Sequence, residues 1–334
     1  MMAVFIDLPV LAGRAMAETN MHYRDAARNG MDAGRGDGPA RRLGAPTQGA
    51  FVHPSVWREG HLTRRTPDMR GTLLGAMLVA VATAGGAHEA SAAEAAIADN
   101  SFLIEEAYNQ EARVVQHIQT LSFTGESWDD VSYGFTQEWP LGGERHQLSV
   151  TVPVERSAGE KTALGDVLLN YRLQLGGGGR PWALAPRLSA ILPTAGEGRG
   201  LDDGAPGLQV NLPASATLGP RAIGHLNAGV TILPGATSRA GEEETLADYH
   251  LGASVIAPGD RPLQFLLEGV LDLEEAAGAA ERVSTWTASP GVRAAWNRGD
   301  AQIVPGFALP VSWTEGANGS KVGLFFYLSI EHPF

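Results

Sequence analysis

The last residues of the chain, Leu324 to Phe334, alternate strictly between two faces. One face carries Leu324, Phe326, Leu328, Ile330, His332 and Phe334, and the other carries Phe325, Tyr327, Ser329 and Glu331. A period of two residues over such a length is typical of a β-strand with one face toward hydrocarbon and the other toward a polar interior. The C-terminus is therefore predicted to be an amphipathic strand that ends on an aromatic residue.

This segment resembles the closing strand of bacterial outer-membrane β-barrels. The resemblance implies that Phe326, Leu328, Ile330 and Phe334 form an assembly signal that the barrel-assembly machinery reads. It also implies that the protein lies in the outer membrane of a Gram-negative bacterium, where its other partners are membrane lipid and lipopolysaccharide.

A candidate export signal lies inside the chain, at residues 69–92. Met69 and Arg70 give a short basic start, residues 73–84 form an apolar stretch, and Ala90, Ser91 and Ala92 form a cleavage site of small residues. The apolar stretch is too short to span a membrane as a helix. We therefore expect a signal peptide at 69–92 and a mature protein that begins near Ala93.

Residues 1–68 are rich in Arg, Gly and Ala and show no sustained period of 2 or 3.6. Five of the seven methionines precede Met69. Our hypothesis is that translation starts at Met69 and that residues 1–68 are an over-extended reading frame. The alternative is a disordered basic extension. N-terminal sequencing of the exported protein separates the two.

After the signal, no run of eighteen apolar residues occurs, and apolar and polar residues alternate in twelve segments. These expected strands are 112–123, 128–139, 146–155, 164–175, 182–192, 207–218, 223–233, 246–256, 262–273, 283–296, 301–313 and 320–334. An even number of amphipathic strands is typical of single-chain outer-membrane barrels. The sequence predicts an all-β protein, a closed antiparallel transmembrane β-barrel of about 12 strands over residues 112–334.

The connectors between the expected strands alternate between short and long. Short turns fall at 176–181, 219–222 and 297–300, and a long connector falls at 234–245. Barrels of this kind have short periplasmic turns and longer external loops. We therefore expect both termini on the periplasmic side.

Six prolines speak against a closed sheet, because each removes a backbone donor and a closed barrel has no free edge. They are Pro153, Pro186, Pro213, Pro290, Pro305 and Pro310. Bulges or misplaced strand ends would accommodate them. The alternative is a secreted, soluble β-sandwich that binds a ligand and holds these prolines at edge strands.

The chain has 25 Lys+Arg against 37 Asp+Glu, a net charge of −12, and no cysteine. An acidic chain without a basic cluster argues against a nucleic-acid partner. Without cysteine, neither disulfides nor thiolate metal sites can form. No metal and no cofactor is expected.

The polar faces of the expected strands give candidate residues for the lining of the barrel interior. They are Asp130, Glu138, Glu155, Asp166, Arg172, Arg187, His225, Asp248, His250, Glu268, Asp272, Arg293 and Glu331. Eight acids against three arginines predict an interior that disfavours anions. The alternative is that these side chains only pair with one another and fill the barrel.

Catalytic residues are not predicted. His250 and Ser254 share a strand face with Asp248 nearby, an arrangement similar to that of outer-membrane lipid hydrolases. Four residues along a strand span ~13 Å, which is too far for a Ser–His hydrogen bond without partners from other strands. A lipid hydrolase is therefore only an outside alternative.

The segment from Asp99 to Gln116, followed by His117 and Ile118, resembles the opening of proteobacterial outer-membrane proteins related to the meta-pathway phenol-degradation transporter family. The resemblance implies passive passage of a small, aromatic or hydrophobic solute. Leu103, Ile104, Ala107 and Tyr108 can share a helical face, so residues 93–111 could form a short helical plug in the barrel. The alternatives are a periplasmic tail at this position and, for the whole protein, a plugged barrel with a structural or adhesive role.

Overall fold

The structure is a computed structural model that describes residues 101–124, 128, 130–156, 161–177, 180–195, 205–219, 222–237, 243–258, 263–276 and 282–334. The expected signal peptide, the residues before it and residues 93–100 lie outside this part of the chain. No helix in the described ranges is long and apolar enough to cross a membrane.

All regular structure in the described residues is β-strand. The strands are β1 (Val114–Thr124), β2 (Asp130–Pro140), β3 (His146–Arg156), β4 (Ala163–Leu164), β5 (Val167–Leu173), β6 (Leu175–Gly176), β7 (Trp182–Leu184), β8 (Arg187–Leu192), β9 (Gly207–Asn211), β10 (Ala214–Thr217), β11 (Ile223–Thr237), β12 (Glu243–Pro258), β13 (Leu263–Ala276), β14 (Arg282–Ala294), β15 (Trp296–Arg298), β16 (Ala301–Ala308), β17 (Val311–Thr314), β18 (Lys321–Val322) and β19 (Leu324–Pro333).

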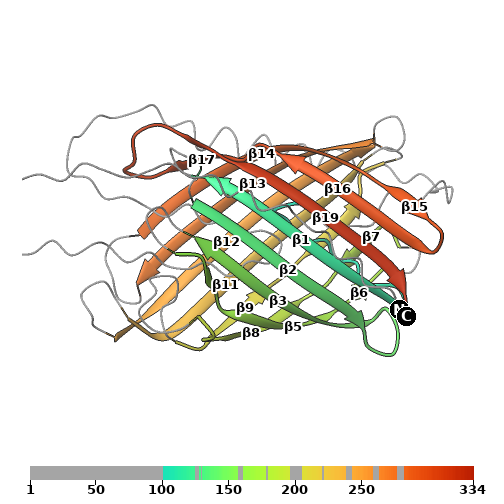
Figure 1. Ribbon diagram of the computed structural model, residues 1–334, viewed down its shortest axis with the longest axis horizontal. Coiled ribbons are helices and arrows are strands. Elements are labelled where there is room, and N and C mark those ends of the chain that lie inside the picture. Colours follow the sequence, from blue (N-terminus) through green and yellow to red (C-terminus); the bar gives the residue numbers. More distant parts are fainter. Residues whose placement is uncertain are drawn as a thin grey trace, which may run out of the picture. The chain divides into compact units, whose positions relative to one another are not determined.

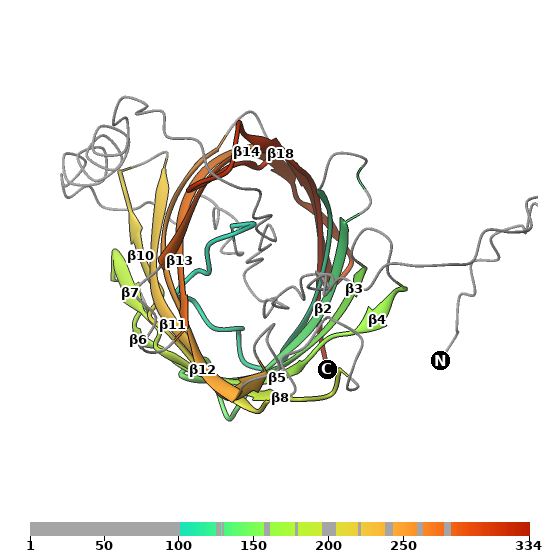
Figure 2. The ribbon, with the colours of Figure 1, turned by 90° about the vertical axis from the view of Figure 1, so that its left-hand side faces the viewer.

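These strands form one antiparallel sheet that closes on itself. β1 pairs with β2 on one side and with the last strand, β19, on the other, so that Leu121 lies opposite both Tyr133 and Phe326. Several labelled strands, such as β5 with β6 or β16 with β17, are consecutive pieces of one barrel strand. Counted this way, the described residues form the twelve-stranded closed barrel that the sequence predicts (Figures 1 and 2).

The barrel has apolar side chains outside and polar side chains inside. Along β5, Leu169 is 46% exposed, whereas its neighbour Asn170 is 2% exposed. The same alternation repeats in β8, where Leu188 is 52% exposed and Ser189 is fully buried. The alternative of a soluble two-sheet sandwich is therefore wrong, because its apolar side chains would pack against each other between the sheets.

The terminal strand β19 follows the alternation read from the sequence. Phe325, Tyr327 and Ser329 are buried on the inner face, whereas Phe326 is exposed on the outer face. The chain ends beside its first strand, because the Phe334 N–H donates to the Arg113 carbonyl at 3.0 Å.

Two adjacent barrel strands that the sequence predicts as continuous are interrupted at a proline. Pro186 separates β7 from β8, and Pro213 separates β9 from β10. Each still accepts a hydrogen bond from the preceding barrel strand, Pro186 from the Leu173 N–H at 3.0 Å and Pro213 from the Ala185 N–H at 2.9 Å. These interruptions, with that between β5 and β6, cross three adjacent barrel strands in one row.

The other prolines are accommodated in similar ways. Pro153 stays within β3, and the facing strand shifts its register between β4 and β5, where the Gly165 N–H donates to the Pro153 carbonyl at 2.9 Å. Pro310 lies between β16 and β17. Pro290 and Pro305 remain inside β14 and β16. A closed sheet thus admits proline where the neighbouring strand bends or breaks.

The long connector predicted at 234–245 is wrong. β11 continues to Thr237 and β12 begins at Glu243. The register shifts between Leu233 and Ala236, and Gly235 has a positive φ of 74°. A proline followed by a glycine normally indicates a turn, but here the pair forms a bulge within a strand that goes on.

Candidate functional site

Residues 101–110, called here the inner segment, lie inside the ring of strands. Figure 2 shows the segment as the teal trace that runs along the inner wall before the chain enters β1. Every residue of it is buried except Tyr108, which is partly buried. The segment is bent and contains no helix, so the helical conformation predicted for it is wrong.

One buried carboxylate holds the start of the inner segment. Oε1 of Glu268 accepts hydrogen bonds from three successive backbone N–H groups, those of Phe102 at 2.9 Å, Leu103 at 2.7 Å and Ile104 at 3.3 Å. Glu268 is fully buried on β13. Three hydrogen bonds to one buried oxygen make this side chain the attachment point of residues 102–104.

Wall side chains continue the attachment along the segment. The N–H groups of four later residues each donate to a side chain of the wall: Glu105 to Asn227 at 2.8 Å, Ala107 to Ser215 at 2.7 Å, Asn109 to Gln174 at 2.6 Å and Gln110 to Gln147 at 2.7 Å. The segment is neither helix nor strand, and its buried amides need partners. The polar inner face supplies those partners.

Two side chains of the inner segment fit into spaces that glycines leave open. A Cβ at Gly306 would overlap the ring of Phe102, and a Cβ at Gly252 would overlap Ile104. The Phe102 ring lies 5.7 Å from that of Phe325 and 5.3 Å from that of Tyr327. Glycine at these wall positions therefore allows the close approach of the segment.

Phe102, Leu103 and Ile104 belong to a buried apolar cluster on the inner face. The cluster is completed by wall residues: Ile118, Ile256, Leu266, Val270, Val304, Ala308, Phe325 and Tyr327. The interior is thus not uniformly polar, because one part of it binds apolar side chains.

A second, smaller cluster contains Ala107, Ala183 and Ala185, with Tyr108 packed against it. Burial and the nearby Glu106 carboxylate raise the pKa of Tyr108 above its usual value. Tyr108 therefore stays a neutral phenol at neutral pH.

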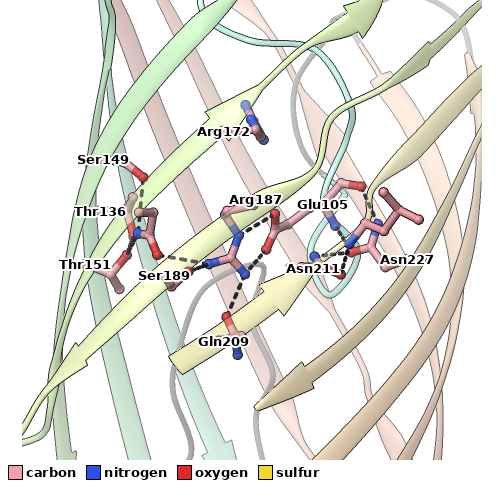
Figure 3. A network of polar contacts seen from close by, with 12 residues as sticks. Glu105, Thr136, Ser149, Thr151, Arg172, Arg187, Ser189, Gln209, Asn211 and Asn227 are labelled. Atoms are coloured by element: carbon pink, nitrogen blue, oxygen red, sulfur yellow. Dashed lines mark hydrogen bonds and ion pairs between the residues drawn. The ribbon is translucent and has the colours of Figure 1, made fainter. Parts of the chain in front are cut away.

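The inner segment also forms an ion pair with the wall. The Arg187 guanidinium donates from Nη2 to Glu105 Oε1 at 2.6 Å and from Nε to Glu105 Oε2 at 3.0 Å (Figure 3). Both side chains are buried. Two parallel bonds of this kind fix the orientation of both groups as well as adding energy.

Arg172 on β5 binds the second half of the segment. It donates to Asn109 Oδ1 at 2.8 Å and to the carbonyls of Tyr108 at 2.8 Å and Glu106 at 3.2 Å. On the wall side, its Nη2 lies 3.7 Å from Glu138 Oε2. Arg172 therefore connects the segment to β2.

Twelve of the thirteen candidate interior residues lie on the strand faces that carry the buried polar side chains, and Asp166 lies between β4 and β5. Seven of them are buried: Glu138, Arg172, Arg187, His225, His250, Glu268 and Arg293. Six are partly exposed: Asp130, Glu155, Asp166, Asp248, Asp272 and Glu331. The buried arginines and Glu268 come together around the inner segment.

The residues that suggested a hydrolase are engaged elsewhere. Ser254 Oγ lies 2.6 Å from Ser101 Oγ, and His250 Nδ1 lies 2.8 Å from Asp272 Oδ1. A Ser–His hydrogen bond does occur between Ser215 Oγ and His225 Nδ1 at 2.7 Å. That serine already accepts the Ala107 N–H, so it serves to hold the segment.

Sequence reasoning missed Glu105 and the neutral wall residues that bind the inner segment, such as Asn227, Gln174 and Gln147. The interior charges predicted from the sequence all lie on expected strands, whereas Glu105 precedes the first strand. The available signal was the Glu105–Glu106 pair directly after the apolar residues 102–104, since a buried apolar stretch places the following charges near a buried counter-charge. In the described part of the chain, no group of three or more His, Asp or Glu side chains could hold a metal ion.

A closed antiparallel barrel with an apolar outer surface and a polar interior is the architecture of an outer-membrane β-barrel of the porin-like class. No protein-family model matches the chain, and no sequence match to a curated protein was found.

Solved structures of similar fold include an outer membrane channel from Pseudomonas putida F1, with a TM-score of 0.49 and 14% identity over 68% of this chain and 98% of that chain. The NanC porin has a TM-score of 0.44 and 8% identity over 65% and 100% of the two chains. The KdgM porin, solved in complex with oligogalacturonate, has a TM-score of 0.39 and 7% identity over 66% and 99%. At such low identities the likeness concerns the fold alone.

Proposed function

We propose that this protein spans the outer membrane of a Gram-negative bacterium and lets a small solute cross passively through its interior. The observation that carries the proposal is the reversal of ordinary burial. Leu208 and Phe265 are 57% and 56% exposed, while Gln209 and Glu268 are buried. Large exposed apolar surfaces mark contact with lipid or a partner, and a polar interior is what a solute path needs.

The orientation is part of the proposal. The short connectors and the meeting point of Arg113 with Phe334 share one end of the barrel, which we assign to the periplasm. Phe326, Leu328, Ile330 and Phe334 would be read there by the barrel-assembly machinery. The outer partners are membrane lipid and lipopolysaccharide, and the acidic composition speaks against nucleic acid.

The solute class follows from the family resemblance of the N-terminal opening. A small aromatic or hydrophobic molecule is supported by the apolar cluster on the inner face, which contains Phe325 and Tyr327. The inner-face polar residues named above would line its path. We also propose that the exported chain begins near Ala93, after a signal peptide at 69–92 and a start at Met69.

A second candidate function is a plugged barrel with a structural or adhesive role. The hydrogen bonds and ion pair between the inner segment and the wall favour it, because they anchor the segment in the interior. The two candidates predict different permeabilities for the same barrel.

Planar-bilayer conductance and liposome swelling of the mature chain, with and without residues 99–111, test both candidates. Solute passage predicts ion current and swelling in the mature chain, and larger values after the deletion. Unchanged single-channel current after the deletion would exclude a plug. No current and no swelling with either protein, while both are folded, would exclude passage and leave the structural role.

A further inference from the structure

We propose that Arg187 is a carboxylate-binding site on the inner face of the barrel, occupied in this structure by Glu105 and open to the carboxylate of an anionic solute when Glu105 is removed or displaced. This inference rests on the proposed passage of solutes and names a chemical class that the interior can recognise. It adds a charge requirement to the apolar preference derived above.

The guanidinium donors of Arg187 are divided between the barrel wall and Glu105. A guanidinium has five N–H donors. Three are used by the wall: Nη1 donates to Asn170 Oδ1 at 2.9 Å and to Ser189 Oγ, and Nη2 donates to Gln209 Oε1 at 2.7 Å. The remaining two, on Nε and Nη2, point at the two oxygens of Glu105. One edge of Arg187 is thus reserved for a single carboxylate.

The wall holds Arg187 in place without contacts from the inner segment. Asn170 donates to Ser149 Oγ at 3.2 Å and to Thr151 Oγ1 at 3.4 Å, and Gln209 donates to Thr231 Oγ1 at 2.9 Å. Figure 3 shows Ser149, Thr151, Ser189 and Gln209 on the strands around the Arg187 guanidinium. The arginine therefore stays in position when the segment does not, which makes it a preorganised site.

Arg187 carries a buried positive charge that needs a counter-charge. Arg187 is 3% exposed, and the wall side chains that bond to it are neutral. Its counter-charge comes from Glu105 alone among the described residues that contact it. Leaving a buried cation unpaired is strongly unfavourable. Binding of a carboxylate from solution to Arg187 should therefore be favourable when Glu105 is removed or displaced.

This position differs from the acidic interior that the sequence predicts to disfavour anions. Arg172 has Glu138 of the wall at 3.7 Å, so its charge is balanced whether or not the segment is bound. Among the wall residues that the structure describes, Arg187 has no such acidic partner. We therefore place the anion preference at Arg187 and not at Arg172.

The test uses the mature chain in detergent, with benzoate as the probe and benzamide as its uncharged counterpart. Glu105→Ala empties the site without cutting the segment. We expect this variant to bind benzoate at least about tenfold more tightly than the unaltered chain by titration calorimetry, and to gain no affinity for benzamide. Glu111→Ala, the same change at the next acid of the chain that is exposed, is the matched control and should behave as the unaltered chain.

The double variant Glu105→Ala with Arg187→Gln should lose the gain in benzoate affinity. If that protein does not fold, Glu105→Ala with Arg187→Lys replaces it, and it should still bind more weakly because an ammonium cannot make the two parallel bonds. Equal benzoate affinity in Glu105→Ala and Glu111→Ala, or undiminished affinity when Arg187 is also changed, overturns the site.

Conductance separates this inference from the proposed function. Benzoate binding without current or swelling would overturn solute passage and keep the Arg187 site. Current and swelling without benzoate binding by Glu105→Ala would keep passage and overturn the site.

Discussion

Phe102 fills a space that exists only because the facing wall residues have no side chain. Gly306 and Gly291 both face its ring, and a Cβ on either would collide with it. At the level of single residues, the inner face is shaped for this one segment as closely as a protein core is shaped for its own side chains.

A double-mutant cycle tests this fit. Gly306→Ala should push the Phe102 ring out of its space, and Phe102→Ala should leave the space empty. Because each change removes the same contact, the combined effect on thermal unfolding should fall short of the sum by about 1 kcal/mol or more. Additive effects within about 0.3 kcal/mol would mean that the two residues do not depend on each other.

Glu268 gives a second prediction at this scale. Glu268→Ala leaves three buried amides of the inner segment without an acceptor, at a cost of about 1–3 kcal/mol for each buried group. The segment should therefore leave the wall more often, and a protease added in detergent should cut between residues 101 and 110 faster than in the unaltered chain. Glu268→Gln, which keeps an oxygen acceptor, should show a smaller increase.

The exposed Glu144 offers the control for this experiment, since Glu144→Ala removes a carboxylate from a connector outside the wall. Cleavage of Glu268→Ala at the control rate would show that Glu268 does not hold the segment.

Among the elements, β12 tests whether the outer face meets lipid. Leu251 lies near the middle of β12 and is 47% exposed. In a membrane barrel, Leu251→Arg should destabilise folding by about 2–4 kcal/mol near the bilayer midplane. In a barrel surrounded by water, a surface change of this kind stays within about 0.5 kcal/mol.

Urea titration of refolding into lipid vesicles measures the difference. Leu141→Arg is the matched control, because Leu141 is also exposed but belongs to a connector at the end of the barrel. Equal effects at both positions would contradict contact of β12 with the hydrocarbon layer.

The strands were predictable to the extent that their side chains alternate. β19 shows this best, because burial alternates from Phe325 to Ser329 as the sequence predicts, with Phe325, Tyr327 and Ser329 buried and Phe326 exposed. The breaks at Pro186 and Pro213 were not predictable in position, since a proline can be accommodated by a bulge, a break or a neighbouring strand. The bulge at Gly235 was read as a turn for the same reason.

The inner segment was the least predictable element. Leu103, Ile104, Ala107 and Tyr108 have helical spacing, yet the segment forms no helix. The reason is that its backbone partners are side chains distant in the sequence, such as Glu268 and Asn227. Local spacing carries no information about those partners, and their hydrogen bonds outweigh a weak helical preference.

For the whole molecule, closure of the sheet gives a prediction about its behaviour on a gel. Because β1 and β19 close the ring, the folded barrel in the described ranges has no free edge strand from which detergent can begin to separate the strands. We expect the unheated protein from a membrane fraction to migrate faster than the boiled protein on a denaturing gel. Identical migration, or recovery of the mature chain in the soluble fraction, would contradict a membrane barrel.

The row of interruptions that crosses the wall at Gln174, Pro186 and Pro213 has a consequence for how the ring responds to thermal agitation. Pro186 and Pro213 lack an amide hydrogen, so fewer interstrand backbone hydrogen bonds can form along this row than at the junction of β1 and β19. Amide hydrogens along this row should therefore exchange with deuterium first. Those at the junction of β1 and β19 should be among the last to exchange.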